Sequence, residues 1–210
     1  SRGIVFVPAG DYLLTSSIEP KAGVKILCEG KGTKFLAGTN SMSMISHTGA
    51  AGSPPVNEFF FEIEGGWFVP NGKTSVTAIE FIGGEVGVSR LSNIILKDMY
   101  ISAMATGINM QNCANIDVSN VFMTACTVGY KQEDCTDVDL INVKAQNGSS
   151  YGFYIIGTSG SPGTAYDEGF RGTNISTNGQ AVGFRADNQD WIQLSNSSFT
   201  TCSILPGDFN

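Results

Sequence analysis

The segments 93-NIILKDM-99, 115-NIDVSNV-121 and 137-DVDLINV-143 are three copies of one pattern, and each copy starts 22 residues after the one before. Each is followed by small polar residues and then by a short apolar segment that begins at a glycine, at Gly107, Gly129 and Gly152. Within a copy, apolar and polar residues alternate with the two-residue period of a β-strand. The chain therefore repeats a unit of short strands.

A repeat of this length without helical segments is typical of a solenoid, because one unit cannot bury its own apolar side. Parallel coils stacked in register would place equivalent residues about 4.8 Å apart. Two buried columns are then expected, one of Ile94, Ile116 and Val138 and one of Leu96, Val118 and Leu140. The sequence predicts an all-β fold, a right-handed parallel β-helix with about 22 residues per coil and about seven or eight coils.

Composition agrees with this fold and narrows the function. The chain has 210 residues, 26 glycines, 15% charged residues and a net charge of −7. The acidic balance argues against nucleic acid as a partner, because that binding depends on Lys and Arg at phosphates. No segment approaches the ~20 apolar residues that span a bilayer, so we expect no membrane insertion. A carbohydrate partner is easier to accommodate.

Neither a metal nor a cofactor is expected. The sequence has one histidine, His47, and no Cys-x-x-Cys spacing, so the usual combinations of metal ligands are missing. The five cysteines are odd in number, and Cys113 and Cys135 fall at equivalent positions of successive coils. They could approach to bonding distance, but we expect buried free thiols that pack as small apolar residues.

The first 35 residues resemble a known superfamily. GIVFVPAGDYLLTSSI at 3–18 and VKILCEGKGTKF at 24–35 are similar to the opening coils of the pectate-lyase-like superfamily, a form also common in bacteriophage tailspikes and capsule depolymerases. The resemblance implies a β-helix that acts on polysaccharide. In the phage branch it also implies a homotrimer on the virion tail.

The domain organisation follows from where the coil pattern is interrupted. Glycine, proline and serine gather at 40–57 and at 157–172, and both stretches are expected to be side loops. The remainder reads as a single domain over 1–210. Because the chain opens directly into a strand and stops without an obvious end cap, we interpret it as a fragment of something longer.

Asp117 and Asp139 are the first candidate catalytic pair, since they occupy one outward-facing position on adjacent coils. Two carboxylates so close repel, which raises the pKa of one of them or attracts a cation or substrate. A pair with separated pKa values can serve as general acid and as base or nucleophile in glycoside hydrolysis. The alternative is a pair of solvated acids with screened repulsion, or a lattice calcium.

Other candidate site residues are more dispersed. Glu62 and Glu64 lie on one face of one strand, beside Trp67, at a separation compatible with glycoside hydrolysis or with a solvent-facing strand. Candidates for substrate binding are the aromatic residues, the acidic turn and the arginine that could face a groove: Trp67, Tyr166, Asp167, Glu168, Arg185 and Trp191. Asn120, Asn142 and Asn196 are expected to form an asparagine ladder at a corner of the coil.

The signature motifs of the enzymatic branches are missing. The polygalacturonase signatures Asn-Thr-Asp, Asp-Asp, Gly-His-Gly and Arg-Ile-Lys do not occur, and the residues of calcium-dependent pectate lyases cannot be matched one by one. Three functions stay open: a phage tailspike or tail-fibre β-helix that binds and degrades a bacterial capsule or O-antigen, a receptor-binding or structural β-helix without catalysis, and a secreted bacterial polysaccharide lyase or hydrolase.

Overall fold

The computed structural model describes residues 3–49, 58–84, 90–157, 169–189, 191–200 and 203–205. Within these residues the fold is all-β, and the only helical element is a single 3₁₀ turn, η1 (Gly30–Gly32). No helix in the described ranges has the length and apolar character needed to cross a membrane.

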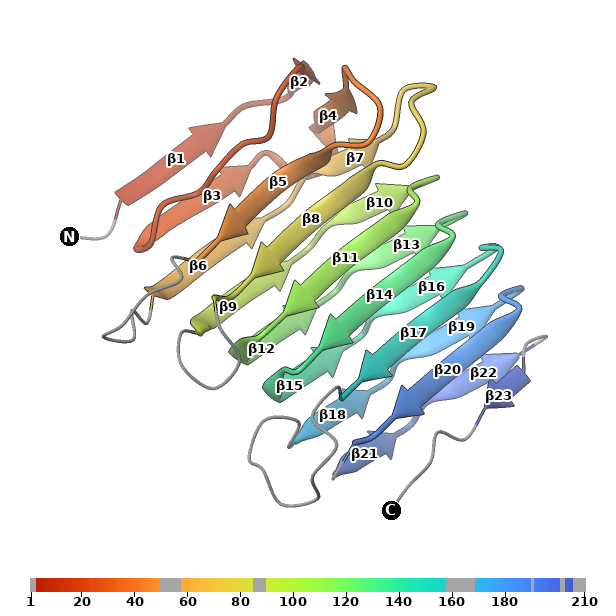
Figure 1. The fold of residues 1–210 in the computed structure, drawn as a ribbon. Helices are drawn as coiled ribbons and strands as arrows, with labels where there is room; N and C mark the ends of the chain where they lie inside the picture. The colour runs from red at the N-terminus through yellow and green to blue at the C-terminus, as the bar shows by residue number, and fades with distance from the viewer. Residues whose placement is uncertain are drawn as a thin grey trace.

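The strands form three parallel sheets (Figure 1). Sheet A contains β1 (Gly3–Val7), β3 (Val24–Cys28), β6 (Glu58–Glu64), β9 (Leu91–Lys97), β12 (Cys113–Ser119), β15 (Thr136–Ile141), β18 (Phe170–Thr173) and β21 (Ile192–Ser195). Sheet B contains β2 (Gly10–Leu14), β4 (Thr33–Ala37), β7 (Trp67–Val69), β10 (Tyr100–Ser102), β13 (Phe122–Thr124), β16 (Lys144–Gln146), β19 (Ser176–Asn178) and β22 (Ser198–Thr200). Sheet C contains β5 (Ser43–Thr48), β8 (Thr77–Ile82), β11 (Thr106–Gln111), β14 (Val128–Glu133), β17 (Tyr151–Ile156), β20 (Val182–Asp187) and β23 (Ser203–Leu205).

The chain visits the sheets in the order A, B, C and then repeats, so one passage through the three sheets is one coil. Eight strands in sheets A and B define eight coils within the described residues. Figure 1 shows the coils advancing from β1 at one end to β21–β23 at the other. The predicted right-handed parallel β-helix is confirmed.

The core lies inside the coil, where equivalent side chains stack. Ile94, Ile116 and Val138 are in register across β9, β12 and β15, and all three are fully buried. Leu96, Val118 and Leu140 form the second predicted column, with at most 1% exposure. The second residue of β11, β14 and β17 is a glycine for a packing reason: a Cβ at Gly129 would lie 2.6 Å from the carbonyl oxygen of Gly152.

A polar ladder occupies the corner between sheets A and B, where the backbone is left-handed at Asp98, Asn120, Asn142, Asn174 and Asn196, with φ between 49° and 59°. Asn120 Nδ2 donates to Asp98 Oδ1 at 3.0 Å, Asn142 Nδ2 to Asn120 Oδ1 at 3.1 Å, and Asn174 Nδ2 to Asn142 Oδ1 at 2.5 Å. Asparagine tolerates this backbone and keeps its amide free to bond along the column. The predicted ladder is confirmed at Asn120 and Asn142, and it includes Asp98 and Asn174 as further members, while Asn196 shares their left-handed backbone.

The predicted side loops are too wide. Residues 43–48 form β5, whose Met44 and Ile45 are fully buried, so the interruption cannot begin at residue 40. The prediction is wrong there because apolar residues in a glycine-rich and proline-rich stretch have no neighbouring copy of the repeat that shows which of them point inward. Phe170–Thr173 is likewise β18, with Phe170 buried in the core. The parts of the two predicted loops at 50–57 and 158–168 lie outside the described residues.

The cysteines follow the expectation of buried thiols. Cys28, Cys113, Cys126 and Cys135 are buried and free. Burial raises the pKa of the Cys28 and Cys126 thiols to about 11, so both stay protonated at neutral pH. Cys202 lies outside the described residues.

Candidate functional site

A groove runs along the outer face of sheet A, formed by two adjoining hollows that share Phe60, Asn93 and Ile95. The larger has a volume of about 410 Å³ and is lined by Phe60, Asn93, Ile95, Asn115, Asp117, Asp137, Asp139 and Arg171. The smaller, of about 250 Å³, is lined by Gly3, Ile4, Gly23, Val24, Lys25, Phe60, Phe61, Glu62, Asn93 and Ile95. The groove therefore extends across the strands, parallel to the axis of the β-helix.

One row of outward side chains lines the groove because the strands of sheet A are in register. The row passes from β3 to β18 as Lys25, Glu62, Ile95, Asp117, Asp139 and Arg171. Neighbours in such a row are about 4.8 Å apart at the backbone. Its middle is apolar at Ile95, and its ends are charged.

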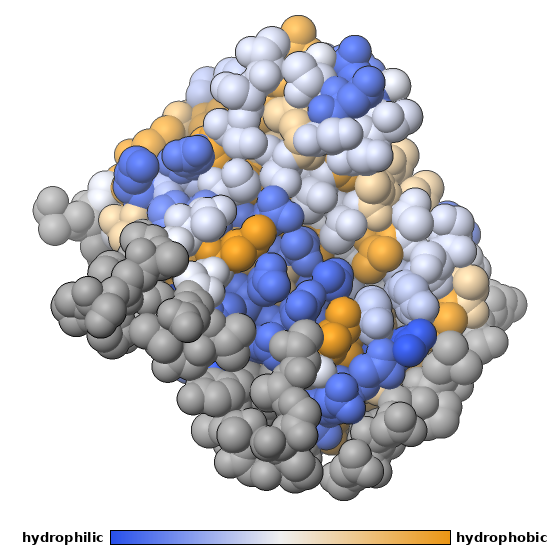
Figure 2. Space-filling view, in the orientation of Figure 1, coloured by the Kyte–Doolittle hydropathy of each residue, from blue (hydrophilic) through white to orange (hydrophobic). Residues whose placement is uncertain are grey.

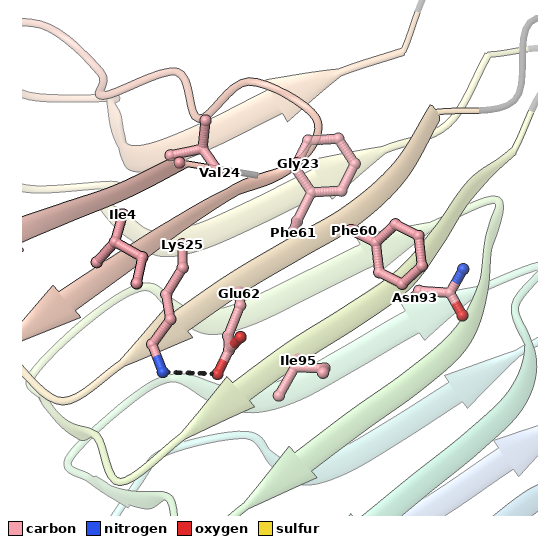
Figure 3. A pocket seen from close by; sticks show the side chains of 10 residues that line it. Ile4, Gly23, Val24, Lys25, Phe60, Phe61, Glu62, Asn93 and Ile95 are labelled. Atoms are coloured by element: carbon pink, nitrogen blue, oxygen red, sulfur yellow. Dashed lines mark ion pairs between the residues drawn. The ribbon is translucent and has the colours of Figure 1, made fainter. Parts of the chain in front are cut away.

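A second row comes from a repeated backbone irregularity. Phe60, Asn93, Asn115 and Asp137 each immediately precede a fully buried residue of their strand, with φ values of 67°, 57°, 52° and 52°. A left-handed residue inserted in a strand redirects its own side chain, as in a β-bulge. In the smaller hollow, Phe60 and Asn93 lie side by side, next to Glu62 and Ile95 (Figure 3).

Asp117 and Asp139 are neighbours, as the sequence predicted. Burial raises the pKa of Asp117, and the negative charge of Asp139 raises it further, while Arg171 opposes both effects. Asp139 is held by Arg171: its Oδ2 accepts a hydrogen bond from Nη2 at 2.9 Å, and its Oδ1 accepts a second from Nε. The two carboxyl groups therefore have different environments, since the pKa of Asp117 is raised and Asp139 is bound by a cation. This difference is what a general acid and a carboxylate base or nucleophile require.

Glu62 and Glu64 lie on one face of β6, as predicted, and both are paired with lysines. Lys25 Nζ lies 3.0 Å from Glu62 Oε1 and 2.6 Å from Glu64 Oε2, and Lys97 Nζ lies 3.2 Å from each of the same oxygens. The four side chains form a closed ion-pair network across three coils. We refer to it as the β6 clamp.

The β6 clamp shifts both glutamate pKa values downward. For Glu62, burial raises the pKa, but hydrogen bonds from Lys25 and Lys97 outweigh burial. For Glu64, the hydrogen bond from Lys25 is the largest influence and lowers the pKa. A general acid needs the opposite shift. The geometry thus favours a stabilising role for this pair.

Trp67 is not beside the glutamate pair, because β7 belongs to sheet B and Glu62 to sheet A. Its indole Nε1 donates to Ser102 Oγ at 3.0 Å, and Lys34 Nζ lies 4.7 Å from the ring centroid. Tyr100 packs its edge against the same indole with a centroid distance of 5.6 Å, and Phe122 stacks on Tyr100. Trp67 therefore belongs to an aromatic ladder of sheet B, in which its ring faces neighbouring side chains.

Arg185 also lies away from the groove, on the outer face of sheet C. Its Nε donates to Asp187 Oδ2 at 2.8 Å, and its guanidinium lies 5.4 Å from the ring centroid of Tyr154. The side of the molecule that bears sheet C is largely hydrophilic in Figure 2, with scattered apolar residues. Arg185 is thus engaged in a local cluster on a different face from Asp117 and Asp139.

Trp191 does adjoin the groove. It directly precedes β21, its carbonyl accepts the backbone hydrogen bond of Phe170, and its ring centroid is 6.0 Å from the guanidinium carbon of Arg171. The side chain is 45% exposed, which leaves surface for a ligand. The remaining predicted binding residues, Tyr166, Asp167 and Glu168, lie outside the described residues.

Several groove residues were not among the sequence candidates for the site. Phe60, Asn93, Asn115 and Asp137 line the larger hollow. Their signal was available, since an asparagine or aspartate stands before the first inward residue in each of the three copies. From the sequence alone, a polar residue at that position indicates only the start of a strand. The left-handed backbone that turns its side chain toward the groove is known only from the structure. No group of three or more metal-ligating side chains occurs among the residues that the structure describes.

Comparison with known proteins gives a likeness of fold. No family model matches the sequence, and no curated protein is recognisably similar to it. Among solved structures, ORF18 of Geobacillus virus E2 is 12% identical with a TM-score of 0.41, covering 99% of this chain and 54% of that one. WceF of Pantoea stewartii, a glycan biofilm modifying enzyme with a bacteriophage tailspike-like parallel β-helix fold, is 12% identical with a TM-score of 0.43, covering 95% and 33%.

The A-module of mannuronan C-5 epimerase AlgE4 from Azotobacter vinelandii is 13% identical with a TM-score of 0.29, covering 99% of this chain and 90% of that one. The chain thus spans about half of the Geobacillus virus protein and a third of the Pantoea protein. At this similarity the likeness concerns the fold alone.

Proposed function

We propose that the chain is the β-helix of a phage tailspike or tail fibre that binds and degrades a bacterial surface polysaccharide, a capsule or an O-antigen. The observation that carries the proposal is the groove on sheet A, in which Asp117 has a raised pKa beside an Asp139 that Arg171 holds. A homotrimer on the virion tail is part of the same proposal, supported by the resemblance of the opening coils to tailspikes.

In this proposal the reaction is hydrolysis of a glycosidic bond. Asp117 donates its proton to the leaving oxygen, while the carboxylate of Asp139 attacks the anomeric carbon and forms a glycosyl-enzyme. Asp117 then removes a proton from water, and the resulting hydroxide releases the sugar and restores both carboxyl groups. Arg171 positions Asp139 by binding both of its oxygens.

The direct test is release of oligosaccharides. The assembled protein would be incubated with capsule and O-antigen from a panel of bacterial strains, and soluble products would be separated by size. We expect products from at least one strain. An unsaturated, ultraviolet-absorbing end group on those products would indicate elimination by a lyase and would replace the hydrolytic mechanism.

A second candidate function is glycan binding without catalysis. It is favoured by the bidentate contact between Arg171 and Asp139, because a carboxylate held by a cation is a weaker nucleophile. Binding to polysaccharide without release of products from any strain would support it. A secreted bacterial hydrolase or lyase is the third candidate, and staining of purified phage particles with an antibody against the chain separates it from the virion proposal.

A further inference from the structure

Phe60 has a backbone conformation that its neighbours reach with more permissive residues. Its φ is 67°, and the equivalent positions of adjoining coils hold Gly23, Asn93, Asn115, Asp137 and Gly169, all with positive φ. Glycine adopts this region freely, and asparagine and aspartate adopt it with short polar side chains. A bulky residue there is an outlier. Among the described residues, Phe60 is the only aromatic residue with a left-handed backbone, and this conformation costs it free energy.

The core covers Phe60 only in part. The ring is 43% exposed, whereas Phe61, the next residue, is fully buried. A strained backbone of this kind persists only where the surrounding structure holds it, and such residues cluster at active sites and ligand-binding positions. The strained backbone therefore points to the groove.

Phe60 lies where the two hollows meet. It lines both, together with Asn93 and Ile95 (Figure 3). An exposed aromatic face next to an apolar Ile95 offers a platform for the C–H face of a pyranose ring, with the Asn93 amide available to hydroxyl groups. The chemistry at this point of the groove fits a sugar ring better than a polar or charged group.

The charges of the groove restrict which sugar fits. Among the described residues, the larger hollow is lined by the carboxyl groups of Asp117, Asp137 and Asp139 and by one guanidinium, that of Arg171. The nearby lysines, Lys25 and Lys97, are paired within the β6 clamp. A uronic acid or other anionic sugar would meet like charge there, which is unfavourable. A neutral sugar would not.

We propose that Phe60 is a stacking residue that seats a neutral pyranose ring at the junction of the two hollows, and that its left-handed backbone is retained for this contact. The inference rests on the proposed function of the groove, and it adds the class of sugar and the residue that selects it.

The test compares Phe60→Asn with Phe59→Asn. Phe59 is 45% exposed and lines neither hollow, so both variants lose a half-exposed ring and only one loses the groove contact. Only Phe60→Asn also relieves the left-handed phenylalanine, because asparagine already occupies that position at Asn93 and Asn115. Phe60→Asn should therefore melt about 2 °C or more above Phe59→Asn.

Binding is measured by calorimetry with purified neutral and acidic polysaccharides from the strain panel. We expect the unchanged protein to bind a neutral polysaccharide, Phe60→Asn to weaken that binding about tenfold, and Phe59→Asn to leave it unaltered. Three outcomes would each overturn this inference and leave the proposed function standing. They are equal affinity of both variants, a strict preference for acidic polysaccharide, and a melting temperature of Phe60→Asn no higher than that of Phe59→Asn. Binding of no polysaccharide by the unchanged protein would overturn the proposed function as well.

Discussion

Arg171 binds both carboxylate oxygens of Asp139, which stands opposite it in the register between β15 and β18. Asp117 is the neighbour of Asp139 on the other side, in β12. Burial and the charge of Asp139 raise the pKa of Asp117, while two hydrogen bonds from a cation hold Asp139. One residue type in two adjacent positions thus acquires two different environments.

Replacing Asp117 tests its role as general acid. Asp117→Asn cannot donate a proton to the leaving oxygen, so kcat for polysaccharide cleavage should fall by about 10²-fold or more. The kcat of Asp139→Asn should fall by at least the same factor, because this substitution removes the nucleophile. Asp11→Asn is the matched control, since Asp11 lies in sheet B and pairs with Lys34 at 3.6 Å. Unaltered turnover in Asp117→Asn would remove this pair from the mechanism.

The pH dependence of activity should report Asp117. An acid catalyst must be protonated, so activity falls as the pH rises through the pKa of Asp117. Arg171 lowers this pKa, and Arg171→Ala should therefore move the alkaline limb of the kcat profile to higher pH. Arg185→Ala removes a guanidinium that is paired with Asp187 on sheet C, and should not move the limb. A shift of the limb to lower pH in Arg171→Ala would contradict the assignment.

The product should retain its anomeric configuration. Asp117 and Asp139 lie on adjacent strands, about 4.8 Å apart at the backbone. Retaining glycosidases hold their carboxyl groups about 5 to 5.5 Å apart, whereas inverting enzymes need about 6.5 to 9.5 Å to admit water. Proton NMR of the first products gives the configuration directly. An inverted product would mean that Asp139 activates water and forms no glycosyl-enzyme.

Breaking the β6 clamp should affect stability more than chemistry. Glu64→Gln removes the charge that Lys25 and Lys97 both contact, and should lower the free energy of unfolding by about 1 kcal/mol at pH 7. The pKa of Glu64 is lower in the folded protein, so this stability is present above the unfolded pKa of about 4.3. It is lost as the pH falls through the folded value.

Urea unfolding at pH 7 and at acidic pH measures the effect. Glu19→Gln is the control, because Glu19 and Lys21 are mostly exposed and 4.0 Å apart. Turnover per folded molecule is expected to survive Glu64→Gln. A large loss of turnover with unaltered stability would return Glu64 to the catalytic candidates.

The asparagine ladder should contribute to stability through two separable effects. Asn142 donates to Asn120, accepts from Asn174 and has a φ of 55°. Asn142→Ala loses both hydrogen bonds and puts alanine, which lacks the polar side chain that lets asparagine tolerate this backbone, in the left-handed region. It should cost about 2 kcal/mol of unfolding free energy. Asn142→Gly loses only the hydrogen bonds, so it should be the more stable variant in thermal unfolding. Equal stability of the two variants would show that the backbone conformation contributes little.

The candidate site was partly predictable. The period placed Asp117 beside Asp139, because in-register stacking is a direct consequence of a fixed repeat length. Trp67 was predicted to lie near Glu62 for a different reason, their closeness in sequence, and that prediction is wrong. A coil turns a corner between Glu64 and Trp67, so the two strands face different directions. Sequence distance predicts spatial distance along a column of stacked residues, but not around a corner.

The sequence by itself determined the coil: its period, the inward columns at Ile116 and Val118, and the ladder through Asn120 and Asn142. These features follow from the alternation of apolar and polar residues and from the equal spacing of the repeats. Both can be recognised without knowing which residues are in contact. Only the tertiary structure decided which charges meet. It paired Arg171 with Asp139 across 32 residues and Lys25 with Glu64 across 39. Such pairs depend on insertions of unequal length between coils, which follow no fixed repeat. The insertions likewise hide from the sequence that Phe60 occupies the same position as Asn93 and Asn115.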